Sequence, residues 1–193
     1  MLTMRRICVY CGSNTGARPD YADAAADLAD VLVRHELELV YGGAAKGIMG
    51  ILADRVLELG GKVHGVIPRM LLEKEIAHEG LTKQHVVGSM HERKSMMAAL
   101  SDGFIAMPGG FGTLEELIEI VTWAQLRFHD KPCGVLNVAN YFWHLLRYLD
   151  HAEQEGFLRA ENRHMLLTDD DAASLVRKFE RYTAPHVDKW IDD

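Results

Sequence analysis

The chain has 193 residues, of which 48% are hydrophobic and 25% are charged, proportions that are ordinary for a globular domain. This composition excludes disordered, collagen-like and low-complexity chains, and no stretch is apolar over the roughly 20 residues that a membrane-spanning helix requires. The net charge of −7 disfavours general binding to nucleic acids and anionic membranes, so a phosphate must be bound locally. The N-terminus lacks the apolar core of a secretion signal, and we expect one cytoplasmic domain spanning residues 1–193.

Short apolar runs alternate with longer segments of helical periodicity along the chain. The short runs predict buried parallel strands at Arg6–Cys11, Leu37–Tyr41, Lys62–Ile67, His85–Val87, Phe104–Met107 and Cys133–Asn137. The longer segments predict helices at Asp20–His35, Ile48–Leu59, Met90–Ser101, Thr113–Leu126, Tyr141–Gln154 and about Asp170–Tyr182. This alternation predicts an α/β fold in which helices cover both faces of a parallel sheet. The stretch Pro68–Lys83 has no clear period, and we expect a mobile connection there.

The three cysteines are an odd number and do not form a disulfide framework. Cys8 and Cys11 have the C-x-x-C spacing of redox proteins. In redox proteins that pair stands at a helix start, where the helix dipole lowers a thiol pKa, whereas here it follows a strand pattern. We therefore interpret the two cysteines as small buried hydrophobic residues, with a redox pair as the alternative.

Glycine-rich segments follow three of the predicted strands, at the edge of a parallel sheet where ligands bind. These segments are Cys11–Asn14, Tyr41–Gly47 and Pro108–Thr113. Glycine lets backbone N–H groups approach an anion closely, and the N-terminus of the following helix adds a partial positive charge. Together the three segments predict a site for a nucleotide or a sugar phosphate.

Several common nucleotide and hydrolase motifs are absent from the sequence. The dinucleotide fingerprint G-x-G-x-x-G and the P-loop G-x-x-x-x-G-K-[ST] do not occur. There is no H-E-x-x-H, no Cys/His pair with zinc spacing and no G-x-S-x-G nucleophile elbow. We therefore predict neither a metal nor an organic cofactor, and we exclude redox-cofactor, NTPase, zinc and serine-hydrolase functions.

The predicted helix Met90–Ser101 carries a charge where an apolar residue is expected. On a helical wheel Arg93 lies within the apolar stripe of the helix and Lys94 lies on its edge. A buried guanidinium must be paired, because an isolated buried charge is very costly. This placement favours a functional role for Arg93, although a long side chain can also reach the rim or pair structurally. Ser89 and Glu92 match a capping box, so we interpret Glu92 as structural.

The predicted helix Thr113–Leu126 follows the third glycine-rich segment and carries three glutamates. Its apolar residues are expected to face the core, namely Leu114, Leu117, Ile118 and Val121. Glu115 and Glu119 lie on the opposite side, whereas Glu116 shares a face with Thr113 above the glycines. A carboxylate beside a sugar phosphate can stabilise an oxocarbenium ion or activate water. The alternative is structural, because Thr113 to Glu116 also matches a capping box.

Two motifs of the chain are specific for one enzyme family. Pro108 to Glu116 matches P-G-G-x-G-T-x-x-E, and Tyr41 to Gly50 resembles Y-G-G-G-x-x-G-L-M-G. Further matching segments are Met90–Lys94, Glu75-Ile76 and Thr122–Leu126, so that the resemblance covers nearly the whole chain. The sequence resembles the LONELY GUY family of cytokinin-activating phosphoribohydrolases. It departs from the pattern at Ala44, which replaces a glycine and could restrict close backbone approach, and at Ile48, which replaces a leucine.

The resemblance implies a Rossmann-like, three-layer α/β sandwich and a homodimer with helices at its interface. It implies hydrolysis of the N-glycosidic bond in cytokinin riboside 5′-monophosphates, giving free base and ribose 5-phosphate, and several bacterial members also accept AMP. It implies no cofactor, and the expected partner besides a second copy is the nucleoside 5′-monophosphate. Members are often labelled lysine decarboxylases, but this chain is short and has no recognisable pyridoxal-phosphate site.

Carried over residue by residue, the resemblance implies that Arg93 and Glu116 form the catalytic pair. The substrate contacts it implies, with two residues added from the other glycine-rich segments, are Glu75, Lys94, Gly109, Gly110, Phe111, Gly112, Thr113, Leu114, Glu115, Thr122, Ser13 and Gly43. The main alternative function is a nucleotide-binding module without catalysis, and regulatory partner binding has no sequence signal. The residues do not distinguish adenine from an N6-prenylated adenine as the base.

Overall fold

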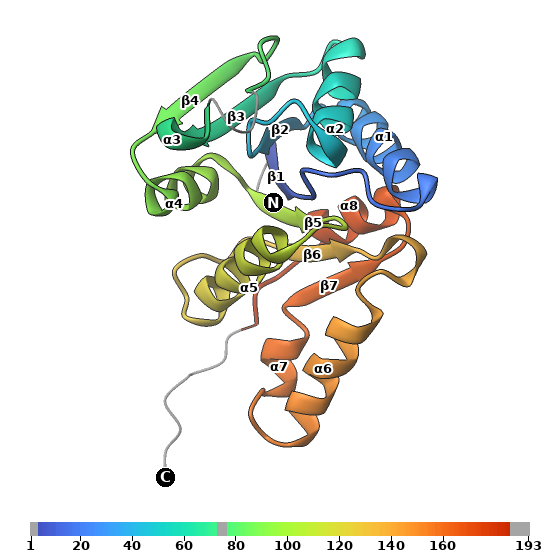
Figure 1. Ribbon diagram of the computed structural model, residues 1–193. Coiled ribbons are helices and arrows are strands. Elements are labelled where there is room, and N and C mark those ends of the chain that lie inside the picture. Colours follow the sequence, from blue (N-terminus) through green and yellow to red (C-terminus); the bar gives the residue numbers. More distant parts are fainter. Residues whose placement is uncertain (1–3, 73–76, 186–193) are drawn as a thin grey trace.

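The computed structural model describes residues 4–72 and 77–185, and it contains one seven-stranded parallel sheet (Figure 1). The strands follow the order β4-β3-β2-β1-β5-β6-β7 across the sheet. Their bounds are β1 Arg6–Tyr10, β2 Glu38–Tyr41, β3 Val63–Pro68, β4 Lys83–Val87, β5 Gly103–Ala106, β6 Cys133–Leu136 and β7 Leu166–Asp169. The all-parallel pairing confirms the predicted α/β class.

Helices cover both faces of this sheet, which makes the molecule a Rossmann-like three-layer sandwich (Figure 1). Helices α1, α2 and α8 pack on one face, and α4, α5 and α6 pack on the other. The bounds are α1 Pro19–Arg34, α2 Gly47–Glu58, α3 Arg69–Leu72, α4 Met90–Leu100, α5 Phe111–Gln125, α6 Trp143–Gln154, α7 Ala160–Arg163 and α8 Ala172–Glu180, with a 3₁₀ turn at Val138–Asn140. The predicted sandwich is confirmed.

The six predicted strands all form, with ends that differ from the prediction by at most two residues. Strand β7 was not predicted, because it has four residues and merges with the polar run that precedes α8. That run caps α8 through Asp171, whose carboxylate accepts a hydrogen bond from the Ser174 N–H at 2.7 Å. Strand β4 lies at the sheet edge, so Lys83 and Val86 are exposed and the prediction of a buried strand is wrong there.

The connection between β3 and β4 is partly structured. It contains the short helix α3, and Ala77 forms an antiparallel bridge with Ala44 in the segment that follows β2. The His78 N–H also donates to the Gly43 carbonyl at 3.0 Å. The connection therefore lies against the second glycine-rich segment, and its mobility stays a prediction.

The apolar stripe of α5 is less buried than its pattern predicts. Leu117 is fully buried, but 39% of Leu114 and 38% of Ile118 are exposed, so their predicted burial is wrong for this chain by itself. Ile120, outside the predicted set, is buried in their place. The helix is rotated about its axis relative to the prediction, and an apolar strip of its surface faces outward.

The strand order reverses direction at one point in the sheet. The chain runs from β1 outward to β4 on one side, and from β5 outward to β7 on the other. The connections that leave β1 and β5 therefore run to opposite sides of the sheet, which places the crevice of this fold class at the carboxyl ends of these two strands. In open parallel sheets, ligands bind at such a switch point.

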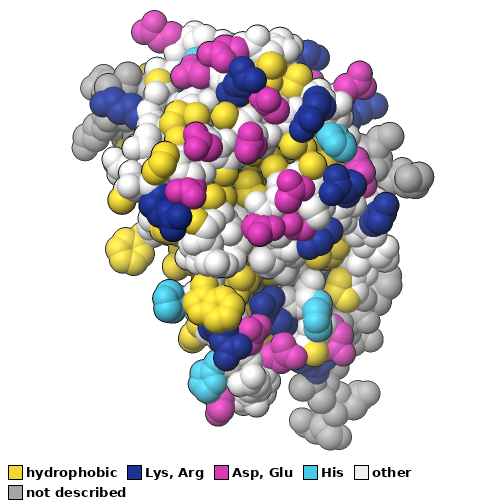
Figure 2. All heavy atoms as spheres, turned by 90° about the vertical axis from the view of Figure 1, so that its right-hand side faces the viewer, with side chains coloured by type: hydrophobic (Ala, Val, Ile, Leu, Met, Phe, Trp, Pro, Cys, Tyr) yellow, Lys and Arg dark blue, Asp and Glu magenta, His cyan; other side chains and the backbone are white. Residues whose placement is uncertain are grey.

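The surface that includes α1 and α2 carries both signs of charge (Figure 2). On this face, Asp and Glu side chains lie among Lys and Arg side chains, so its described residues form no continuous basic area of the kind that attracts nucleic acid phosphates. Within the described ranges, no helix combines the length and the apolar character needed to cross a lipid bilayer.

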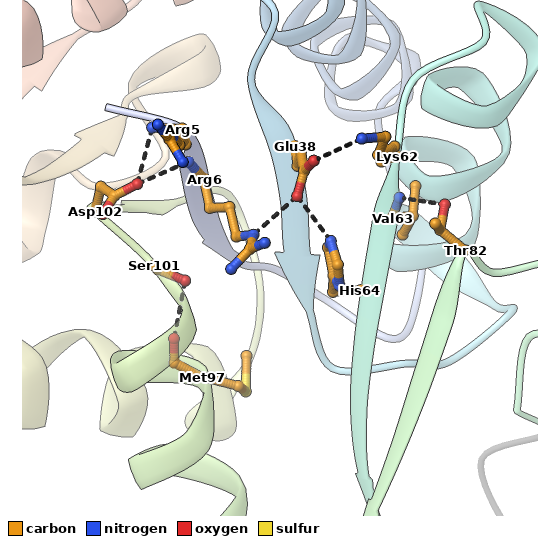
Figure 3. Close-up of polar contacts among 10 residues, drawn as sticks. All are labelled: Arg5, Arg6, Glu38, Lys62, Val63, His64, Thr82, Met97, Ser101 and Asp102. Carbon is orange, nitrogen blue, oxygen red and sulfur yellow. Dashed lines mark hydrogen bonds and ion pairs between the residues drawn. The ribbon is translucent and has the colours of Figure 1, made fainter. Parts of the chain in front are cut away.

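A charge network joins the amino ends of three neighbouring strands (Figure 3). The Glu38 carboxylate on β2 accepts hydrogen bonds from Arg6 Nε at 2.8 Å and Lys62 Nζ at 3.2 Å, and its oxygen lies 2.9 Å from His64 Nε2. The Arg6 guanidinium above all, then His64 and Lys62, hold the pKa of Glu38 at about 2. Because the folded state prefers the ionised carboxylate, this network stabilises the fold wherever Glu38 is charged.

We expect Glu38→Gln to lower the free energy of unfolding at pH 7 by about 2–3 kcal/mol, since the pKa of this carboxylate, about 2, lies well below its ordinary value. The contribution is complete above the ordinary pKa and is lost as the pH falls toward 2. The difference between variant and natural chain should therefore shrink between pH 5 and pH 3 in urea unfolding.

Glu36→Gln is the matched control, because this neighbouring carboxylate is exposed and makes no ion pair with the described residues. It should leave the unfolding free energy nearly unchanged at both pH values. A Glu38→Gln deficit that stays constant over this pH range would show that shape rather than charge is responsible.

Candidate active site

The loops that follow β1, β2 and β5 meet at the switch point. The Gly12 N–H donates to the Pro108 carbonyl at 3.0 Å, and the Gly12 carbonyl accepts from the Met49 N–H at 3.3 Å. Gly47 has a φ of +63°, and a Cβ at this position would lie 2.2 Å from the carbonyl carbon of Ser13. The three glycine-rich segments therefore form one surface, as the sequence predicted, and glycine is required for their close contact.

The start of α5 is open and lacks a side-chain cap. Its N-cap residue is Gly110, so the helix begins at Phe111, two residues before the predicted start. A Cβ at Gly110 or Gly112 would meet nothing within 4 Å, whereas one at Gly109 would lie 2.1 Å from Thr113 Oγ1. The N–H groups of a first helical turn have no intrahelical partner, and together with the dipole they form a ready site for an anion.

The position of this N-cap tests the capping-box interpretation of Glu116. A capping box would require Thr113 at the N-cap, but Thr113 lies inside the first turn and is buried. The capping-box alternative for Glu116 is therefore wrong. Glu116 is half-buried on the second turn of the helix that begins at the glycines.

The negative charge of Glu116 raises the pKa values of side chains in β1 and just after it. Burial raises the pKa of the Cys8 and Cys11 thiols well above its usual range, and the negative charge of Glu116 raises it further. Burial, the neighbouring Cys8 and Glu116 likewise raise the pKa of Tyr10. The Glu116 carboxylate thus lies near the carboxyl end of β1. Both cysteines are free and buried as thiols, which supports their structural interpretation.

Arg93 is buried within α4, as predicted, with 6% of its surface exposed. Its Nη2 donates to the Gly42 carbonyl at 3.4 Å, and its Nη1 lies 3.9 Å from Met90 Sδ. The pairing of Arg93 with Glu116, which the family resemblance implies, stays a prediction. Arg93 lowers the pKa of Cys8 while Glu116 raises it, so both charges lie near this one thiol.

Lys94 joins α4 to α5 beside these two residues. Its Nζ lies 2.5 Å from a Glu115 oxygen and 3.0 Å from a Glu119 oxygen, and 11% of its side chain is exposed. The predicted substrate contacts Lys94 and Glu115 therefore bind each other. Because the sequence neighbours of this pair are Arg93 and Glu116, the ion pair fixes the two helices at the level of the predicted catalytic residues.

The other predicted substrate contacts lie in different surroundings. Ser13 is exposed on the loop after β1, and Phe111 is 94% exposed at the start of α5. The Thr122 hydroxyl donates to the Ile118 carbonyl of its own helix at 2.7 Å, and it lies well beyond the glycines along α5. Glu75 falls outside the described residues.

The segment after β2 contains a position that sequence reasoning missed and one that it doubted. Gly42 contacts Arg93 through its carbonyl, whereas the sequence singled out Gly43, whose φ of +81° requires glycine. Ala44 is 1% exposed and packs in the core between the sheet and the helices α1 and α2. Its methyl group therefore lies in the core, whereas Ala45 and Lys46 of the same segment are exposed.

A mostly apolar pocket of about 350 Å³ adjoins the start of α5 on the side of α6. It is lined by Gly109, Gly110, Phe111, Thr113, Leu114, Tyr141, Phe142 and Leu145. The Tyr141 hydroxyl donates to the Gly109 carbonyl at 2.5 Å and so fixes the loop from this side. Among the described residues, no group of three His, Cys, Asp or Glu side chains is placed to hold a metal ion.

Comparisons with known proteins show which family the chain belongs to. A family model described as possible lysine decarboxylase matches residues 49–179. The chain is 51% identical over 178 residues, 92% of its length and 78% of the relative's, to the cytokinin riboside 5′-monophosphate phosphoribohydrolase LOG5 of Arabidopsis thaliana. It is 47% identical to LOG1 of the same plant, over 94% of its own length and 85% of the relative's.

Solved structures share the fold at low sequence identity. The molybdenum cofactor binding protein of Rippkaea orientalis superposes with a TM-score of 0.69 at 19% identity, covering 94% of this chain and 98% of that one. The Moco carrier protein of Chlamydomonas reinhardtii gives a TM-score of 0.68 at 18% identity, covering 92% and 96%. These likenesses concern the fold alone. On the sequence identity with the plant enzymes, the chain belongs to the LONELY GUY family of cytokinin riboside 5′-monophosphate phosphoribohydrolases.

Proposed function

We propose that this protein hydrolyses the N-glycosidic bond of cytokinin riboside 5′-monophosphates and of AMP, releasing the free base and ribose 5-phosphate. The observation that carries the proposal is the uncapped start of α5, with Glu116 on the next turn of the same helix. An anion site and a carboxylate are thereby held one helical turn apart on a rigid element. Relatives that are about half identical carry the name of this activity.

The 5′-phosphate would bind at the first turn of α5. The N–H groups of Phe111, Gly112 and Thr113 point out of the helix there, and the open space at Gly110 and Gly112 admits an anion. The segments after β1 and β2 would enclose the ribose from the other side of the crevice. The phosphate then anchors the nucleotide while the bond to be broken lies several bonds away.

Glu116 would stabilise the positive charge that develops at C1′ or orient the attacking water. Arg93, a fixed cation near the same strand end, would assist the departing base and favour the ionised form of the carboxylate. The Lys94 ion pairs would keep the two helices, and hence these charges, in register. We propose that the reaction takes place in the cytoplasm, where the three buried thiols remain reduced.

We expect the phosphate to be required. Its binding energy is remote from the reacting bond, so that truncation lowers turnover as well as affinity. A few charge-assisted hydrogen bonds predict that adenosine has a kcat/KM at least about 100-fold below that of AMP. ADP and ATP should also be poor substrates. Release of free adenine measures all four, and comparable values for adenosine and AMP would refute the phosphate site at α5.

We expect Glu116→Gln to lower kcat by about 100-fold or more while AMP still binds, because an amide has the shape of the carboxylate without its charge. Glu119→Gln is the control on the same helix. Glu115 still holds Lys94 there, and turnover should stay within about threefold of the natural chain. Adenine release and AMP calorimetry give the two readings. Near-natural turnover in Glu116→Gln would favour a nucleotide-binding module without catalysis at this residue.

We also propose that the protein is a homodimer in which the outward strip of α5 meets a second copy. Leu114 and Ile118, whose pattern predicts burial, are more than one-third exposed in one chain. Phe111 at 94% and Met90 at 38% are further exposed apolar residues, at the start of α5 and of α4. Helices at the interface agree with what the family resemblance implies.

We expect Ile118→Asp to convert the dimer into a folded monomer of 21.6 kDa, because a desolvated carboxylate at an apolar contact is costly. Phe157→Asp, which places the same charge on a 90% exposed apolar residue after α6, should leave the dimer intact. Analytical ultracentrifugation distinguishes the two masses. A natural chain that sediments as a monomer would contradict the proposal directly.

A further inference from the structure

The loop after β2 comes close to the buried Arg93 guanidinium. The Gly42 carbonyl oxygen accepts a hydrogen bond from Arg93 Nη2 at 3.4 Å. A Cβ at Gly42 would lie 2.2 Å from the same Nη2 and 3.0 Å from Met49 Sδ. The guanidinium therefore occupies the volume that any side chain at this position would need.

We propose that Gly42 is a positioning residue for Arg93: its missing side chain leaves the space for the guanidinium, and its carbonyl orients Nη2 beneath the crevice. The inference rests on the proposed function for the role of Arg93, and on geometry for the contact itself. Gly42 itself lies outside the proposed phosphate site at the start of α5 and is not part of a tight turn.

The surroundings of the guanidinium explain why packing decides its position. Arg93 is 6% exposed, and among the described residues its Nε has no hydrogen-bond partner and its Nη1 contacts the Met90 sulfur at 3.9 Å. Its bond to the Gly42 oxygen, the one that Arg93 makes to an oxygen within residues 4–72 and 77–185, is longer than the usual 2.7–3.2 Å and is correspondingly weak. The position of the guanidinium therefore depends largely on packing against Gly42 and the Met90 side chain.

Glycine is needed here for space and not for conformation. Gly43 and Gly47 have positive φ angles, which L side chains rarely adopt, but Gly42 does not. Gly42→Ala is therefore compatible with the backbone, and its methyl group collides with side-chain atoms alone, Arg93 Nη2 and Met49 Sδ. This makes the substitution a specific probe of the guanidinium.

The test is a double-mutant cycle of Gly42→Ala and Arg93→Ala, with thermal unfolding of the four full-length chains without substrate. Forcing a methyl against the guanidinium should lower the Tm of Gly42→Ala by about 3–10 °C. In the Arg93→Ala chain the same methyl enters vacated space, so the second substitution should leave the Tm unchanged or raise it. An equal loss in both backgrounds would overturn the proposal.

Gly50→Ala is the matched control. A Cβ at Gly50 would lie 2.4 Å from the Ala45 carbonyl oxygen, so this methyl also collides near the same loop, but with backbone and without Arg93. It should lower the Tm equally in both backgrounds. If Gly42→Ala does not fold by itself, a folded double variant supports the proposal and an unfolded one overturns it.

Activity gives the second reading. A displaced guanidinium near the reacting bond should lower kcat for AMP by about 10- to 100-fold, with KM changed by less than about threefold, since the phosphate site is untouched. Natural kcat in a folded Gly42→Ala chain would overturn the positioning role. The Tm cycle needs no substrate, so an enzyme that does not accept AMP would refute the proposed function while leaving the packing inference to be decided by the cycle.

Discussion

The reversal of strand order between β1 and β5 is the constraint on which the site depends. Because the chain leaves these neighbouring strands in opposite directions, no crossover helix covers their carboxyl ends, and the Gly12 and Pro108 loops can join there through one backbone hydrogen bond. Helices α4 and α5 then pack on the same sheet face. Arg93 and Glu116 reach one strand end because their helices share that face, although 23 positions separate them in the sequence.

The charged residues of the molecule differ in how well they are paired, and the buried Arg93 is among the poorly paired ones. Among the residues that the structure describes, Arg93 has one weak oxygen contact, whereas Lys94, the next residue, has two carboxylates within 3.0 Å. These strong ion pairs are thus made by Lys94, the neighbour of Arg93. At the amino ends of the strands, Glu38 has three basic partners and a pKa of about 2, so well-paired charge lies far from the crevice. Such a division suits a site that must keep an incompletely paired charge for its substrate.

Sequence reasoning predicted what depends on local pattern. Strand and helix periods, the three glycine-rich segments and the burial of Arg93 all follow from spacing along the chain, and the structure agrees. It failed where distant residues decide. The capping-box alternative could not be settled without knowing that α5 begins at Phe111, and the Lys94 ion pairs join two helices that the pattern treats separately. Gly42 gives no signal among neighbouring glycines, because its reason is a side chain that is 51 positions away.

Three sides of helix α5 face different surroundings, and for this reason the sequence pattern predicts its buried side incorrectly. Leu117 and Ile120 are buried against the sheet, and Leu114 and Ile118 are partly exposed. The charge of Glu116 lies close enough to β1 to raise the pKa of Cys8. A wheel with apolar residues on two sides and a carboxylate between them looks like one broad core face. If the outward side is an interface, then assembly and chemistry act on the same rigid helix, so that contacts made by a second copy fix the element that carries both the anion site and the carboxylate.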